Sequence, residues 1–206
     1  MQGKATMNEE FQQLANWIDK TYGVKTMNII YDKIDKDEKP RLNIIFEKCE
    51  ESELFSNGAG FDEVRQHEIA SKFELDLNNS RIPPKYQTSN ILVIFSAFEP
   101  IAKTETYWRV SKDEIDNLRL ELNMKDLWTI HSNTFDSPTF FFYTDKQLKE
   151  YSNSEIKQLL TKKCFEVIKK YDDFNYFREE QFLIQFDSKE NFENYYKGSW
   201  FNYDRR

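Results

Sequence analysis

The sequence predicts an α+β fold in which a mostly antiparallel sheet packs against several helices. Segments with the apolar spacing of helices are mixed with short apolar runs of strand length, and the two kinds do not alternate in a regular βαβ order. Of the 206 residues, 39% are apolar and 32% are charged, a balance that lets the chain bury a sizeable core as one domain over 1–206. A subdivision of this domain would fall in the loop 78–90, which contains Pro83-Pro84.

In the first half of the chain, the expected elements are bounded by residues that start or stop regular structure. Asn8 is a typical N-cap, and Gly23 is a typical C-terminal stop of a helix. The segment 73–77 alternates as a strand would, but the four-residue spacing of Phe61, Arg65, Ile69, Phe73 and Leu77 favours a helix there. The expected elements are a helix at 9–22, strands at 27–31 and 42–46, a loop at 50–60, a helix at 61–77 and a strand at 91–95 that is buried on both faces.

The second half begins with a run at 104–110 that has the length of a strand. Ser111 and Glu114 form a capping box, and Asp187 or Ser188 is placed to cap a last helix. The expected elements are a strand at 104–110, a helix at 111–123, paired strands at 127–130 and 139–143, a helix at 154–171, a strand at 182–186 and a short helix that ends near Gly198. No internal repeat is apparent in the sequence.

Composition excludes several classes of function. The formal net charge of -7 argues against a nucleic-acid ligand, because phosphate binding needs a basic field. No run of about 20 apolar residues suits a membrane span. With only five glycines, the sequence contains no Gly-rich phosphate-binding loop motif, and no cofactor is expected. The two cysteines, Cys49 and Cys164, are far apart, which suits reduced thiols in a cytoplasm.

The histidines and cysteines give little support to catalysis. His67 follows Glu63 by four residues, so both would share a helix face, but a metal site needs further ligands at defined spacing. His131 is interpreted as a loop residue after a strand. Cys164 lies on the apolar face of its helix and is expected to be a small buried hydrophobe, while acidic residues after Cys49 would raise a thiol pKa.

Asp187-Ser-Lys189, with Asp173 upstream, provides the alternative enzymatic hypothesis. Two carboxylates and a lysine near a strand resemble the PD-(D/E)xK nuclease arrangement, in which the acids hold Mg²⁺, and would make the chain a metal-dependent hydrolase or nuclease. Against it, Asp173 follows a helix rather than a strand, and helix capping explains Asp187 and Ser188 without chemistry. A calcium loop at 32–38 lacks the glycine and the distal glutamate of an EF-hand, so a solvated hairpin tip is the preferred interpretation.

The last 36 residues, 171–206, are about one-third aromatic. Some of these side chains are expected to dock the chain end onto the sheet. The others would line a protein-binding patch, since Trp and Tyr are typical hot-spot residues. The candidate binding residues are Tyr195, Tyr196, Trp200, Phe201 and Tyr203.

The segment 187–203 resembles the tail of small acidic bacterial proteins of uncharacterised function, some of which lie beside secreted toxins and are regarded as immunity proteins. The resemblance implies a bacterial, non-enzymatic protein but supplies no catalytic residue. The leading hypothesis is a cytoplasmic protein-binding domain, an immunity-type inhibitor of a basic partner. A structural accessory domain of a larger assembly is a further alternative, and the sequence does not define the oligomeric state.

Overall fold

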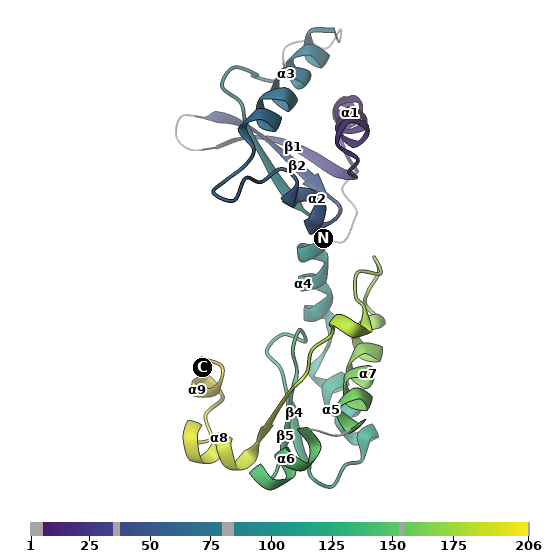
Figure 1. Ribbon diagram of the computed structural model, residues 1–206, viewed down its shortest axis with the longest axis vertical. Helices are drawn as coiled ribbons and strands as arrows, with labels where there is room; N and C mark the ends of the chain where they lie inside the picture. The colour runs from purple at the N-terminus through teal and green to yellow at the C-terminus, as the bar shows by residue number, and fades with distance from the viewer. Residues whose placement is uncertain (1–5, 35–37, 80–84, 153–154, 206) are drawn as a thin grey trace. The chain divides into compact units, whose positions relative to one another are not determined.

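The computed structural model describes residues 6–34, 38–79, 85–152 and 155–205 (Figure 1). Its contacts divide the chain into two compact units, Met1–Ala102 and Lys103–Arg206, called unit one and unit two below. Each unit has its own three-stranded sheet covered by helices, which confirms the α+β class. The sequence predicts one sheet, but the strands expected at 91–95 and 139–143 lie in two different sheets, one in each unit.

Unit one is built on the strand order β1-β2-β3, with β1 and β2 antiparallel and β2 and β3 parallel. Its elements are η1 (Glu9–Phe11), α1 (Gln12–Tyr22), β1 (Thr26–Ile34), β2 (Lys39–Phe46), α2 (Cys49–Glu53), α3 (Glu63–Asn79) and β3 (Leu92–Ala97). The predicted boundaries of the first helix are confirmed: the Asn8 side chain accepts a hydrogen bond from the Glu10 amide, and Gly23 ends α1 in the left-handed conformation with φ 69°. Glycine adopts this conformation without the steric cost that other residues incur.

The core of unit one lies between its sheet and helices α1 and α3. Leu14 and Ile18 of α1 and Phe73 of α3 pack with Ile44 and Phe46 of β2, all of them buried. Alternate residues of β2 point to this core, as the two-residue period of a strand requires. The helical interpretation of 61–77 is thereby confirmed, since Phe73 faces the core from within α3.

Unit two has the strand order β4-β5-β6, again with one antiparallel and one parallel pair. Helix α4 (Glu99–Arg109) carries the boundary between the units. The elements that follow are α5 (Lys112–Leu122), β4 (Leu127–His131), β5 (Thr139–Phe142), α6 (Asp145–Ser152), α7 (Glu155–Lys169), η2 (Glu179–Gln181), β6 (Gln185–Ser188), α8 (Lys189–Tyr196) and α9 (Trp200–Tyr203). Leu118, Leu160, Cys164 and Ile168 form its buried helix faces, as predicted from their spacing.

Several expectations are corrected. Residues 104–110 lie largely in α4 rather than in a strand, and Pro100 in the first turn is typical of a helix start. The loop 50–60 begins with the short helix α2, and α6 was not expected at all. Strand β6 starts at Gln185, three residues later than expected.

Strand β3 is not buried on both faces. It lies at the edge of the unit-one sheet, where Val93 and Phe95 face the core, while Leu92 and Ile94 on the other face are half-buried. The expected subdivision loop 78–90 includes residues 80–84, which lie outside the described part of the chain. Helix α3 before this loop and β3 after it pack together within unit one, and the single-domain expectation stays a prediction.

Candidate functional site

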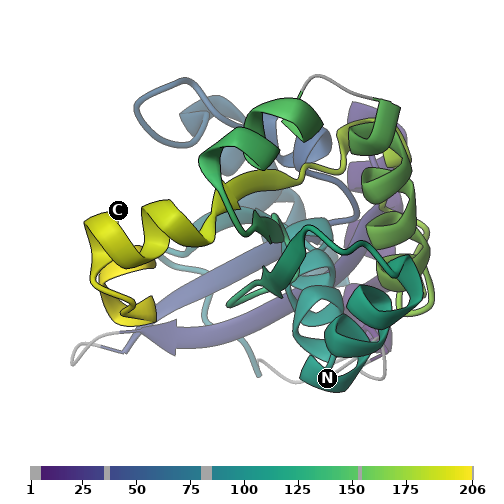
Figure 2. The ribbon, with the colours of Figure 1, turned by 90° about the horizontal axis from the view of Figure 1, so that it is seen from below.

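The candidate site is the α8–α9 segment at the end of unit two. In Figure 2, α8 follows directly from the end of β6, and α9 comes after it. Ser188 caps α8 through a hydrogen bond from the Asn191 amide to its Oγ (2.9 Å), which confirms the predicted capping role. Lys197 then adopts the left-handed conformation with φ 56°, and Ser199 caps the single turn of α9. These caps turn the chain so that α9 returns to the sheet.

Aromatic rings hold α8 and α9 onto the face of the sheet that lies away from α5 and α7. Phe141 of β5, Phe192 of α8 and Tyr203 of α9 are buried together, with Trp128, Tyr196 and Trp200 packed around them. The Trp200 ring lies 4.1 Å from the Phe192 ring and 5.2 Å from the Phe141 ring, measured between centroids. Contacts of this geometry stabilise beyond the apolar area that they bury.

A buried carboxylate lies at the base of this aromatic layer. Asp187, only 5% exposed, accepts a hydrogen bond from the Tyr203 hydroxyl (2.7 Å) and another from the Asn191 side-chain amide (2.9 Å). It therefore ties α9 and α8 to the last strand of the sheet. A buried carboxylate needs hydrogen-bond donors, and those of Asp187 come from α8 and α9, so these hydrogen bonds have a structural role.

His131 joins the same layer and is not the loop residue that the sequence suggested. It is the last residue of β4, and its ring stacks on Trp200 with a centroid distance of 3.8 Å and an interplanar angle of 12°. Its Nε2 lies 2.8 Å from Asp204 Oδ1, just after α9. Sequence reasoning missed both partners, since nothing in the local pattern links His131 with residues more than 65 positions later.

The five predicted binding residues separate into three environments. Tyr203 is 2% exposed and belongs to the core, while Tyr196 and Trp200 are half-buried against the aromatic layer. Tyr195 and Phe201 are 77% and 62% exposed. The Arg205 guanidinium lies 3.8 Å from the centre of the Phe201 ring. The docking of part of the aromatic tail onto the sheet is thus confirmed, and a binding role for the exposed rings stays a prediction.

Two open, polar hollows flank the pair formed by His131 and Asp204. One is lined mainly by the chain between β4 and β5, including Asn133 and Asp136, together with Gln185. The other is lined by the start of α5 and by β4 residues, with Trp200 at its edge. In the first hollow the Thr134 hydroxyl donates a hydrogen bond to Asp136 Oδ1 (3.0 Å), and the Ser132 hydroxyl donates one to the Thr134 carbonyl oxygen. The hollows therefore add polar surface beside the aromatic layer.

The side chains of the enzymatic alternative have separate partners. Asp173 pairs with Arg109 (2.8 Å), Lys189 pairs with Glu193 (3.3 Å), and Asp187 is held by the contacts described above. Within the described ranges, no three His, Cys, Asp or Glu side chains are arranged to hold a metal ion. His67 is exposed on α3.

The thiol of Cys164 is fully buried, which confirms the expected position in the core, and this burial raises its pKa above the ordinary value. At the hairpin of β1 and β2, Asp32 pairs with Arg41 (2.5 Å), and Lys33 pairs with Glu38 (2.8 Å), while residues 35–37 of the calcium alternative lie outside the described residues.

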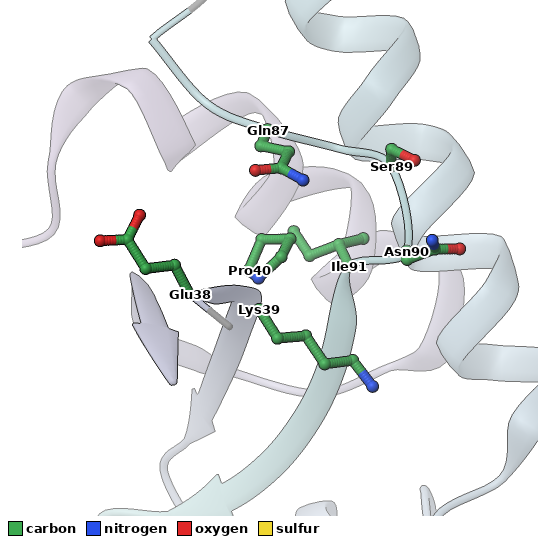
Figure 3. Close-up of a pocket in the computed structure, with 7 residues that line it drawn as sticks. All are labelled: Glu38, Lys39, Pro40, Gln87, Ser89, Asn90 and Ile91. Carbon is green, nitrogen blue, oxygen red and sulfur yellow. The ribbon is translucent and has the colours of Figure 1, made fainter. Parts of the chain in front are cut away.

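Unit one has a hollow between the start of β2 and the chain that leads into β3 (Figure 3). Glu38 and Asn90 at its rim both have positive φ, 51° and 56°. In Figure 3 the Glu38 carboxylate and the Lys39 side chain extend in different directions rather than converging on one point. Ligand sites rely on convergent polar groups, so this hollow does not have their geometry.

Comparison with protein-family models, with curated proteins and with solved structures finds no match to this chain. In the part of the chain that the structure describes, no helix combines the length and the apolar character needed to cross a lipid bilayer.

Proposed function

We propose that this chain is a non-enzymatic, cytoplasmic bacterial protein that binds another protein through α8 and α9. The observation that carries the proposal is the pair of exposed rings Tyr195 (77%) and Phe201 (62%), which lie on helices fixed by the aromatic layer beneath them. We call these two rings, with the outer edges of Tyr196 and Trp200, the α8–α9 surface.

Fixed aromatic side chains are efficient anchors for a protein interface. They supply a large contact area and lose little conformational entropy on binding, because only two side-chain torsions are ordered. Here the backbone is already held by Tyr203, Asp187 and His131, so binding would not have to order α9. Pre-organisation of this kind lowers the free-energy cost of association.

Charge supports a basic partner, in line with an immunity-type inhibitor. Unit one contains 17 acidic and 12 basic residues, and unit two contains 19 acidic and 17 basic residues. The negative excess therefore comes mainly from unit one. The segment 189–205, which carries the α8–α9 surface, has three acidic and three basic residues. Long-range attraction by this field would raise the association rate, while the aromatic anchors would set the dissociation rate.

The test is capture of a partner from host lysate, followed by measured association and dissociation rates. Tyr195→Ala and Phe201→Ala are expected to speed dissociation about tenfold or more, because hot-spot truncations act mainly on that rate. Leu120→Ala is the matched control, since Leu120 is 63% exposed on α5 and outside the surface. Association should slow as salt rises. Equal dissociation rates for all three variants would contradict the proposal.

A further inference from the structure

The two units contain the same elements in the same order. Each has a helix, two antiparallel strands, two more helices, a third strand parallel to the second, and a helix that follows this strand. The equivalent elements are α1 and α5, β1 and β4, β2 and β5, α2 and α6, α3 and α7, β3 and β6, and α4 and α8. Apart from η2, which has no counterpart between α3 and β3, these seven elements follow one another in the same order with identical strand pairing, which indicates more than a shared fold class.

The same irregularity occurs at the same place in both sheets. In each, the register shifts at the start of the first strand, so that one extra residue bulges, Met27 in unit one and Trp128 in unit two. The paired residues around the shift are Thr26 with Phe46 and Asn28 with Ile45 in unit one, and Leu127 with Phe142 and Thr129 with Phe141 in unit two. A bulge is a specific structural feature, and its recurrence fixes the residue-by-residue equivalence.

Three hydrogen bonds also recur between equivalent atoms. The amide of the residue after the second strand donates to the carbonyl of the residue before the first strand. The amide of the residue before the next helix donates to the side chain three positions later, and a glutamate after the third strand accepts from the first amide of that helix. In unit one these bonds run from Glu47 N to Lys25 O (2.9 Å), from Lys48 N to Glu51 Oε2 (2.8 Å) and from Cys49 N to Glu99 Oε2 (3.2 Å). In unit two they run from Tyr143 N to Asp126 O (3.1 Å), from Thr144 N to Gln147 Oε1 (2.9 Å) and from Asp145 N to Glu190 Oε2 (2.8 Å).

The units differ on one face of the sheet. This face lies away from α1 and α3 in unit one, and away from α5 and α7 in unit two. In unit two, α8 and α9 cover this face, and Phe141 is fully buried there. In unit one, Ile45 holds the equivalent position and is only half-buried, and Ile30, equivalent to His131, is 42% exposed. After α4, the equivalent of α8, the chain enters α5 of unit two, so no counterpart of α9 follows.

We call Met27, Ile30, Ile45 and Ile94 the open sheet face of unit one. None of the four belongs to a buried core cluster of the described residues. Ser96, equivalent to the buried Asp187, shares this face and donates a hydrogen bond to the Asn43 side chain (3.0 Å). Asn28 and the ion pair of Asp32 with Arg41 (2.5 Å) also lie on this face, and Asn28 accepts a hydrogen bond from the Ile29 amide (2.9 Å). These polar side chains have partners within unit one, so an apolar helix face can cover the apolar residues without leaving a buried polar group unpaired.

We infer that the chain contains two copies of one structural repeat, and that the open sheet face of unit one docks a basic amphipathic helix with aromatic side chains from a partner protein. The helical shape and the aromatic residues follow from unit two, where α8 and α9 cover the equivalent face with Phe192 and Trp200. The basic character follows from the 17 acidic and 12 basic residues of unit one. This docking does not depend on the α8–α9 surface proposed above.

The test uses the full chain labelled with ¹⁵N and a synthetic helix of about 18 residues, long enough to be stable when bound. The helix has Trp and Phe on one face and lysines on the other, and a matched helix has glutamates in place of the lysines. The lysine helix is expected to shift the amide signals of Ile30, Ile45 and Ile94, and Ile45→Lys or the more exposed Ile30→Lys should weaken its binding about tenfold or more. Tyr195→Ala should leave it unchanged.

Three outcomes would overturn the docking inference. The first is that the glutamate helix binds as tightly as the lysine helix. The second is that amide signals change only in α1, α3 or unit two. The third is that Ile45→Lys and Ile30→Lys, both with native-like spectra, bind the lysine helix with unchanged affinity. Weakening by Tyr195→Ala alone would instead support the α8–α9 surface and count against this face.

Discussion

Replacing Tyr203 by Phe tests whether the buried carboxylate holds α9 in place. The substitution keeps the ring, which is 2% exposed, and removes only the hydroxyl that donates to Asp187 over 2.7 Å. A hydrogen bond to a charged group contributes about 1.5–3 kcal/mol, and its loss leaves a buried acceptor with one donor fewer. We therefore expect the free energy of unfolding of unit two to fall by about 1.5–3 kcal/mol.

The assay is urea unfolding followed by tryptophan fluorescence in a Trp17→Phe background. The remaining tryptophans, Trp108, Trp128 and Trp200, all lie in unit two, so the signal reports that unit. Tyr195→Phe is the matched control, because Tyr195 is 77% exposed and should change stability by less than about 0.5 kcal/mol. A loss below about 0.5 kcal/mol for Tyr203→Phe would refute the argument that this hydrogen bond fixes α9.

Four further outcomes are expected. Leu160→Ala should lower the free energy of unfolding by about 2–5 kcal/mol, whereas Leu159→Ala, its 51% exposed neighbour, should change it little; equal losses would contradict the core assignment. Burial raises the pKa of the Cys164 thiol, so in the folded protein a thiol reagent should modify Cys49 first, and Cys164 should react only on unfolding. Since the unfolded thiol ionises at lower pH than the folded one, Cys164 should also reduce stability as pH rises above about 8.5, which a Cys164→Ala comparison of unfolding against pH would detect. Gly23→Ala should cost about 1 kcal/mol in thermal or urea unfolding, because Gly23 has φ 69°.

The sequence was most informative where one segment determines its own structure. Asn8 and Gly23 bound the first helix, Ser111 and Glu114 form the expected capping box, and Leu160 and Cys164 lie on the expected buried face of α7. These features depend on residues a few positions apart. Local hydrogen bonds and helical spacing are therefore enough to predict them.

Features that depend on distant residues could not be predicted in the same way. Pairing of β2 with β3 requires two helices and a loop in between, and strand alternation does not identify a partner. The stacking of His131 on Trp200 joins β4 to α9. The repeat was missed because equivalent positions hold different residues, such as Ser96 and Asp187 on the third strands.

The shared topology of the two units has a consequence for folding. In each unit, two helices separate the second strand from the third along the chain, so the equivalent strands β3 and β6 could compete for the same edge during folding. If β3 paired with β5, Ser96 would take the place of Asp187, and α4 rather than α8 would follow it. Phe141 and Trp128 would then lose their aromatic cover. The divergence of the two repeats therefore disfavours exchange of strands between them, and so protects a tandem protein from a common route to misfolding.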